Sequence, residues 1–145
     1  MHLSIFGIPK PQGSKRVFNG RVVEAAGQGL KIWRKQIEES CLSIVSEEHS
    51  LLLDSVRVEV TFYLPRPASV SIKKRPAPIV PPDLDKLLRG LLDGIGQSQV
   101  IWQDDSQVTE IVARKVYADD REPGAEVVIY SLSLPGAQID TRHLT

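Results

Sequence analysis

The chain has little cysteine and little histidine: Cys41 is its single cysteine, and only three histidines occur among its 145 residues. One cysteine cannot build a disulfide framework or a cysteine-based zinc site, and the histidines lack metal-ligand spacing. No apolar run approaches the ~20 residues that span a bilayer. Residues 1–9 lack the basic start and long apolar core of a signal peptide. These absences exclude disulfide-stapled secreted and membrane-spanning classes, so we expect a cytoplasmic protein with Cys41 in its core.

Net charge is also absent, because 18 Lys and Arg residues balance 18 Asp and Glu residues. A zero balance argues against an ordinary nucleic-acid-binding domain, which is usually basic. The basic residues are nevertheless gathered in residues 1–37 and in the acid-free stretch 65–82. Such asymmetry can make one face of a neutral protein positive. The alternative is that each of these residues is simply a solvated surface side chain.

Length and composition predict a single domain with its own core. A chain of 145 residues suits one domain, and an apolar share of 41% is enough for a core. We expect a mixed α+β (α/β) fold over residues 1–134, in which a small mixed β-sheet packs with two main helices. Residues 135–145 contain little to bury, so we expect them to form a flexible C-terminal tail.

Periodicity predicts where the helices and strands lie. Strict alternation predicts a half-buried strand over 56–64, and further strands are expected over 2–8, 106–117 and 127–134. Apolar residues on both sides of 106–117 favour a central position in the sheet. Asn19-Gly20 between short apolar pairs predicts a hairpin. Three- and four-residue spacing predicts a helix over 28–48 and a second one that begins after Asp83 and ends near Gly94 and Gly96.

Two aspartates, Asp83 and Asp85, stand at i and i+2 where the second predicted helix begins, after a proline-rich loop with three consecutive bases. Their carboxylates can point into one cleft, where the positive end of the helix dipole partly offsets their mutual repulsion. Taken alone, the pair favours a structural interpretation, with Asp83 as the N-cap and Asp85 as a first-turn acid. A functional interpretation of the pair needs a second acidic segment.

A second acidic segment, Asp104-Asp105, precedes the strand predicted over 106–117. Adjacent acids are poor strand formers, but they make sense as ligands that reach a cation from the mouth of a strand. We expect Asp105 to face the cleft, with Asp104 behind it or on the surface. Together with Asp83 and Asp85 it would complete a site for one Mg²⁺ or for two ions ~4 Å apart, the arrangement that assists phosphodiester displacement.

Two cations, Lys86 and Arg89, share the polar face of the second helix with Asp85 and Asp93. Either could bind a scissile phosphate and stabilise charge that develops in the transition state. Alternatively, Asp85–Arg89 and Arg89–Asp93 are i, i+4 helix salt bridges worth a few tenths of a kcal/mol each. For Asp93 we favour such a supporting role beside the site.

Three segments together, Pro82–Arg89, Leu92–Ile95 and Trp102–Val108, resemble the RusA family of Holliday junction resolvases from bacteria, their phages and prophages. The likeness is close over 82–115 and looser over 9–15 and the following helix. It implies a Mg²⁺-dependent endonuclease, with Mn²⁺ as a substitute, that acts as a homodimer in DNA recombination and repair. Such an enzyme would cut two strands of a four-way junction symmetrically, with Asp83, Asp85 and Asp105 as metal-binding catalytic carboxylates.

The chain departs from the family pattern at two cations. Lys86 stands where the pattern has Asn, and Arg89 stands where it has a catalytically useful Lys. Arg keeps the charge but presents a planar fork instead of a point charge, so either residue could supply the cation. Phosphate contacts, which give affinity without sequence readout, are expected from the basic loops and one later lysine: Lys10, Lys15, Arg16, Arg21, Lys73, Lys74, Arg75 and Lys115.

Three alternative functions remain open at this point. The first is a nuclease for other branched DNA, such as flaps and forks. The second is a non-catalytic junction-binding protein, which the intact Asp83, Asp85 and Asp105 count against. The third, a metal-binding structural protein without nucleic acid, is disfavoured by the basic loops.

Overall fold

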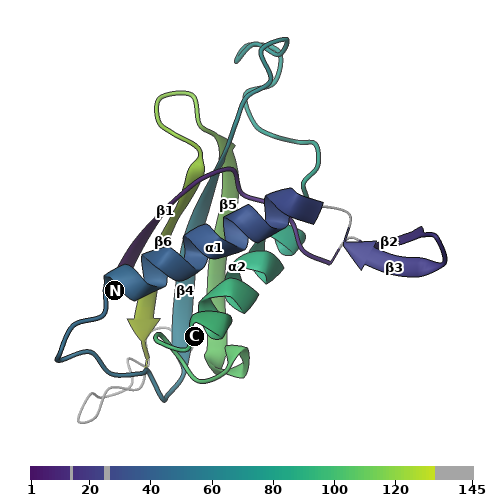
Figure 1. The fold of residues 1–145 in the computed structure, drawn as a ribbon. Helices are drawn as coiled ribbons and strands as arrows, with labels where there is room; N and C mark the ends of the chain where they lie inside the picture. The colour runs from purple at the N-terminus through teal and green to yellow at the C-terminus, as the bar shows by residue number, and fades with distance from the viewer. Residues whose placement is uncertain (14, 25–26, 133–145) are drawn as a thin grey trace.

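The computed structural model describes residues 1–13, 15–24 and 27–132, although for 15–18 and 22–24 it describes the backbone alone. Its strands are β1 (His2–Phe6), β2 (Lys15–Phe18), β3 (Arg21–Glu24), β4 (Val56–Leu64), β5 (Val108–Tyr117) and β6 (Gly124–Ser131). Its helices are α1 (Gly27–Ser43), α2 (Leu84–Ser98) and the short 3₁₀ helix η1 (Asp105–Gln107). The fold is therefore the predicted mixed α+β type (Figure 1). None of the helices in these ranges is both long and apolar enough to cross a bilayer.

The main sheet has the strand order β1-β6-β4-β5, and β2 and β3 form a separate hairpin. β4 and β5 are parallel, whereas the β1–β6 and β4–β6 pairs are antiparallel. Parallel neighbours need a long crossover connection, and this connection contains α2. The sheet therefore fixes one end of α2 beside the end of β4 and the other end beside the start of β5.

β5 lies at the edge of the sheet, so the prediction of a central strand over 106–117 was wrong. Its apolar residues on both sides suggested burial on both faces, yet Ile111 and Val112 remain 42% and 38% exposed. Among the described strands, β5 pairs with β4 alone. An edge strand presents unpaired backbone groups to any further strand, so β5 is an open edge of the described sheet.

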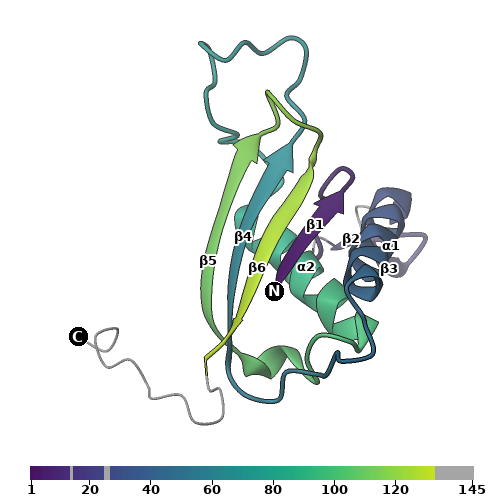
Figure 2. The same cartoon turned by 90° about the vertical axis from the view of Figure 1, so that its left-hand side faces the viewer.

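Both helices cover one face of the sheet, as Figure 2 shows from the side. α1 buries Leu30, Trp33, Ile37 and Cys41, and α2 buries Leu87, Leu91 and Ile95. β4 alternates strictly between buried and half-buried residues, which fits one face packed on helices. Burial raises the pKa of the Cys41 thiol to about 11, as expected for the predicted core residue.

The element boundaries differ from the predicted ones where local turns intervene. The hairpin occurs as predicted, and Asn19 and Gly20 both have positive φ, at 50° and 75°. α1 ends at Ser43 instead of residue 48, and β6 begins at Gly124 instead of residue 127. β5 starts at Val108 because residues 105–107 form η1. The expected end of the domain at 134 and the expected tail 135–145 lie outside the described residues.

Candidate functional site

The first acidic group lies at the N-terminus of α2. Asp83 is the N-cap residue, but its side chain makes no capping hydrogen bond and is 56% exposed. Lys86 Nζ lies 3.8 Å from Asp83 Oδ2. Asp85 is exposed in the first turn of the helix. The two carboxylates are thus free to accept further ligands, with a cation beside them.

The second acidic group lies where η1 meets the other end of α2. Trp102 Nε1 donates a 3.0 Å hydrogen bond to Asp105 Oδ1. A Cβ added to Gly96 would lie 2.5 Å from the same oxygen, so only glycine leaves room for this carboxylate. Burial raises the pKa of Asp105; the Trp102 bond opposes this effect, and the neighbouring Asp93 adds to it. Asp105 is therefore held close to α2 in a site that favours its neutral form.

Asp104 lines the same hollow as Asp93 and Asp105, and it stabilises η1. Its carboxylate accepts a 2.9 Å hydrogen bond from the backbone N–H of Ser106, and its own backbone N–H donates a 3.0 Å bond to the side-chain oxygen of Gln107. This reciprocal pattern is a capping box. Hydrogen bonds from Ser106 lower the pKa of Asp104. Its contribution is thus to position the turn that carries Asp105.

The two acidic groups lie at opposite ends of α2. Gly96, against which Asp105 packs, follows Asp85 by eleven residues in the sequence, and a rise of 1.5 Å per residue makes this about 16 Å. Among the described residues, no three His, Cys, Asp or Glu side chains are placed to hold a metal ion together. The structure of the chain therefore does not bring Asp83, Asp85 and Asp105 together.

Arg89 and Asp93 have different surroundings on α2. Neither of the possible i, i+4 ion pairs of Arg89 occurs among the described residues, and Arg89 is exposed beside Gly13. Asp93 instead accepts a hydrogen bond from the Gln12 side chain, whose oxygen accepts one from Arg34. Sequence reasoning missed Gln12 and Arg34, because their meeting depends on the docking of residues 9–13 across α2 through the 3.0 Å bond from Gln12 N to Lys86 O.

The predicted phosphate-binding residues have different surroundings. Arg21, Lys73 and Lys74 are exposed, whereas Lys10 and Arg75 are half-buried. The side chains of Lys15 and Arg16 lie outside the described part. Lys115 donates 2.9 Å hydrogen bonds to the carbonyls of Val80 and Pro82, so its ammonium supports the loop before Asp83 and is not directed at solvent.

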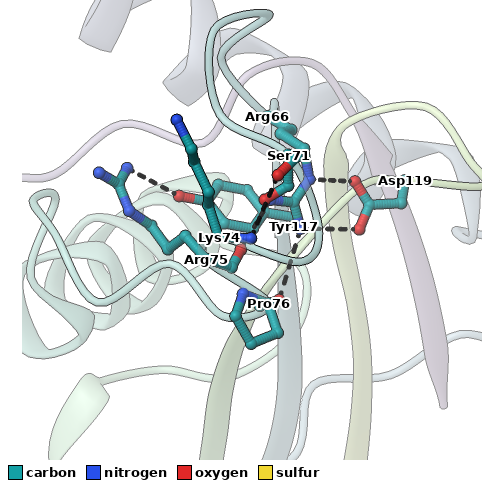
Figure 3. Close-up of polar contacts among 7 residues, drawn as sticks. All are labelled: Arg66, Ser71, Lys74, Arg75, Pro76, Tyr117 and Asp119. Carbon is teal, nitrogen blue, oxygen red and sulfur yellow. Dashed lines mark hydrogen bonds and ion pairs between the residues drawn. The ribbon is translucent and has the colours of Figure 1, made fainter.

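Arg66 organises the proline-rich loop 65–82, a role that sequence reasoning did not assign (Figure 3). Its guanidinium donates to both carboxylate oxygens of Asp119, at 2.6 and 3.0 Å, and lies 4.1 Å from the ring centre of Tyr117. It also donates to three carbonyls of the loop, those of Ser71, Arg75 and Pro76. The same bond from Arg66 lowers the pKa of Asp119. The sequence signal that could have indicated this role is the position of Arg66 between Pro65 and Pro67.

Comparison with known proteins assigns the chain to a family. Residues 7–130 match the family model described as Endodeoxyribonuclease RusA. The chain is also 28% identical over 144 residues to the uncharacterized protein YqaN of Bacillus subtilis (strain 168). The alignment covers 90% of this chain and 95% of that protein. The matched range contains both ends of α2 and the loop that Arg66 organises. From this match over most of its length, the chain belongs to the RusA family of endodeoxyribonucleases.

Proposed function

We propose that the protein is a divalent-metal-dependent endonuclease that resolves four-way DNA junctions by paired, symmetric hydrolysis of two phosphodiester bonds. The observation that carries this proposal is the pair of free carboxylates, Asp83 and Asp85, beside Lys86 at the N-terminus of α2. This pair lies within the range that matches an endodeoxyribonuclease family. The absence of a side-chain cap at Asp83 disfavours the purely structural interpretation of the pair.

The donor chemistry of this pair fits Mg²⁺, with Mn²⁺ as a substitute. Mg²⁺ uses oxygen ligands and is usually held by one or two carboxylates together with water and substrate phosphate, and both side chains are exposed enough to accept it. When bound, the ion would supply Lewis-acid stabilisation of charge on the scissile phosphate. Asp83 and Asp85 would hold it, and Lys86 or Arg89 would contact the phosphate.

The exposed cations suit the sugar-phosphate backbone of the junction arms. Arg21 lies on the β2–β3 hairpin, whereas Lys73 and Lys74 lie on the loop that Arg66 holds. Contacts of this kind give affinity that falls steeply with salt and that does not depend on base sequence. Recognition would therefore rest on the shape of the junction, with the chemistry confined to the acidic groups.

We propose further that the enzyme is a homodimer in which Asp105 of the partner subunit completes each metal site. About 16 Å separates Asp85 from the Asp105 end of its own helix. A twofold axis relates identical surfaces, so two antiparallel α2 helices would place the N-terminus of one beside the C-terminal end of the other. A four-way junction with near-twofold symmetry suits two such sites.

The surface available for this pairing lies on α2 and β5. Three leucines of α2 are only partly buried against the core: Leu84, Leu88 and Leu92. Each directly precedes one residue of the polar row Asp85, Arg89 and Asp93. Ile111 of the β5 edge pairs with the buried Val58, so it points to the face of the sheet that α2 covers, and it is 42% exposed. The apolar face of α1, by contrast, is packed against the core of its own chain.

The decisive experiment is cleavage of a synthetic four-way junction by mixed dimers. Wild-type protein with Mg²⁺ should produce paired, symmetric nicks, and Asp85→Asn and Asp105→Asn chains should each be inactive alone. In a mixed dimer of the two variants, shared sites would leave one site complete and the other lacking both carboxylates. We therefore expect single nicks to return on mixing.

The other outcomes separate the remaining interpretations. If the mixed dimer stays inactive while the wild type cuts, each site is built from one chain. Equal cutting of forks, flaps and four-way junctions would mark a broader branched-DNA nuclease. Binding without cutting in Mg²⁺ or Mn²⁺ would mark a non-catalytic junction binder, and the absence of any binding to branched DNA at low salt would refute the proposal.

A further inference from the structure

A cleft of about 580 Å³ opens directly beside Asp83. Three segments that are distant in sequence, 8–11, 64–67 and 78–83, form its walls, together with Lys86 and Tyr117. Seven of the residues that line it are prolines. The volume falls within the roughly 300–1,000 Å³ of ordinary ligand sites. Neither the carboxylates nor the phosphate-binding lysines of the proposed nuclease require such an apolar space.

The walls of this cleft are fixed before any ligand arrives. Proline rings lock the backbone φ angle, and Lys115 holds the carbonyls of Val80 and Pro82 at 2.9 Å. Tyr117 is buried, with Arg66 over its ring and Arg75 3.4 Å from its hydroxyl. A preformed cleft avoids the entropy cost of ordering its walls on binding, so it is suited to a rigid, flat ligand.

The charges at the cleft point to an anionic ligand with an apolar body. Lys10 and Lys86 are its two lining cations, and Asp83 is its single lining acid. Proline walls offer ring carbons and carbonyl oxygens but no N–H donors. A flat heterocycle between two phosphates matches this combination, because the ring would meet the prolines and the phosphates would meet the lysines. This is the chemistry of a nucleotide whose base has left the stack.

We propose that this cleft binds an unstacked nucleobase of the DNA strand next to the phosphodiester bond that is cut. The inference rests on the proposed nuclease function and adds a base-binding subsite to it. Enzymes that extrude a base hold it between apolar or aromatic side chains, and extrusion is easiest where stacking is already interrupted. The branch point of a junction interrupts stacking, and Asp83 belongs both to the cleft and to the acidic pair.

Fluorescence of 2-aminopurine tests the proposal directly. The base analogue is placed at one position at a time on either side of the cut in a four-way junction, with Ca²⁺ replacing Mg²⁺ so that binding is observed without rapid cutting. Emission should rise about fivefold at one position when wild-type protein binds, because an unstacked base is no longer quenched by its neighbours. Positions further along the arm should not respond.

A cleft-filling variant, Ile8→Trp, locates the site of the base. Ile8 lines the cleft and is 50% exposed, so a larger side chain can be accommodated without disturbing the core. Ile8→Trp should abolish the emission rise and slow cutting in Mg²⁺ about tenfold, with a much smaller change in junction affinity. Leu53→Trp is the matched control, because Leu53 is 64% exposed and lies outside the cleft. Ile8→Ala, which shortens the wall, should give an intermediate rise.

Removing the base itself closes the test. An abasic nucleotide at the responsive position should slow the wild type about tenfold but leave Ile8→Trp unchanged, because the two changes remove one interaction. If no position responds while the wild type cuts, or if Ile8→Trp and Ile8→Ala both keep the full rise, the base site is refuted and the nuclease stands. A rise that Ile8→Trp abolishes in a protein that never cuts would support the base site and refute the nuclease.

Discussion

Aspartates lie near both ends of α2, but their exposure and their hydrogen-bond partners differ. At the N-terminal end, Asp83 and Asp85 are exposed, make no capping bond, and have Lys86 as a neighbour. At the C-terminal end, Asp105 and Asp93 are half-buried and are held by the neutral donors Trp102 and Gln12. The first end is open to new ligands. The second is already ordered, and it places two carboxylates where neither is well solvated.

This difference indicates complementary tasks. An exposed pair can take up a cation together with its water and a substrate phosphate, as Mg²⁺ requires. A half-buried pair of like charges raises the pKa of one member, so a divalent cation brought against it relieves both burial and repulsion. In the proposed dimer, the exposed end of one chain would bind the ion with its water and phosphate ligands. The half-buried end of the other chain would add a carboxylate that is already held in place.

The largest expected effect is at the exposed end. Asp85→Asn should lower the single-turnover rate of junction cutting by roughly 10²–10³-fold or more, the range for losing one preorganised electrostatic group. Junction affinity should change little, since Asp85 contributes repulsion to the DNA and not attraction. Glu47→Gln, at an exposed position remote in sequence from α2, is the matched control. Retention of cutting within about tenfold of wild type would show that Asp85 is only a helix-start acid.

The next effect concerns the space beside Asp105. Gly96→Ala should displace the Asp105 carboxylate, because the added Cβ would lie 2.5 Å from Oδ1. A displacement near 1 Å can cost up to about 10²-fold in rate, so we expect a loss of roughly 10- to 100-fold in cutting. Circular dichroism should show a folded protein. Glu39→Ala, at an exposed position of α1 outside the hollow that Asp105 lines, should cut normally; equal losses in both variants would contradict the explanation.

A smaller expected effect is on thermal stability, where substitutions at the two ends of α2 should have different consequences. Burial and Asp93 raise the pKa of Asp105 in the folded protein. A carboxyl group with a raised folded pKa stabilises the fold below its unfolded pKa, and this contribution is lost as the pH rises through the folded pKa. Asp105→Asn should therefore raise the melting temperature at pH 7 by about 2 °C while cutting is lost. Asp85→Asn should leave the melting temperature unchanged, and the gain from Asp105→Asn should shrink towards pH 4.

If Asp105→Asn instead lowers the melting temperature, its hydrogen bond with Trp102 outweighs the cost of the buried charge. The same substitution in the presence of Mg²⁺ and junction DNA gives an internal check. Ligand that binds only the folded protein stabilises it by mass action, so the wild type should gain more from Mg²⁺ than either variant does.

The smallest effect concerns the loop beside the exposed end. Arg66→Lys keeps the charge but loses the planar fork that reaches Asp119 and three carbonyls. Amide exchange in residues 71–76 should become faster, and junction affinity should fall about threefold with a shallower salt dependence. Arg57→Lys is the matched control, because Arg57 also pairs with carboxylates but on the sheet. Unchanged exchange would show that the prolines alone order the loop.

Local features of this fold follow from the sequence, whereas the placement of the acidic groups does not. The alternation of 56–64, the Asn19-Gly20 turn and the helix after Asp83 depend on neighbours within a few residues. The distance between Asp85 and Asp105 depends on a crossover connection and on the bond between Trp102 and Asp105. Likewise, a lysine in a strand gives no sign that it will hold two carbonyls of a remote loop, as Lys115 does.

The edge position of β5 shows the same limit. Apolar side chains on both sides of a strand predict that both faces are covered, but they do not say whether the cover comes from the same chain. If the partner subunit provides it, the pattern in 108–117 describes the dimer, and one protomer alone cannot account for it.

The length of α2 determines the distance between the two acidic groups. Asp85 lies in the first turn of α2 and Asp105 packs against Gly96 near the other end, so a change in the length of this helix alters their spacing in steps of 1.5 Å and 100° per residue. Inserting a single residue between Arg89 and Asp93 would turn the two ends away from each other, whereas inserting four would nearly restore their direction and add about 6 Å. In the proposed dimer, length variation in α2 should therefore be tolerated in whole turns, matched by a compensating shift between the two chains.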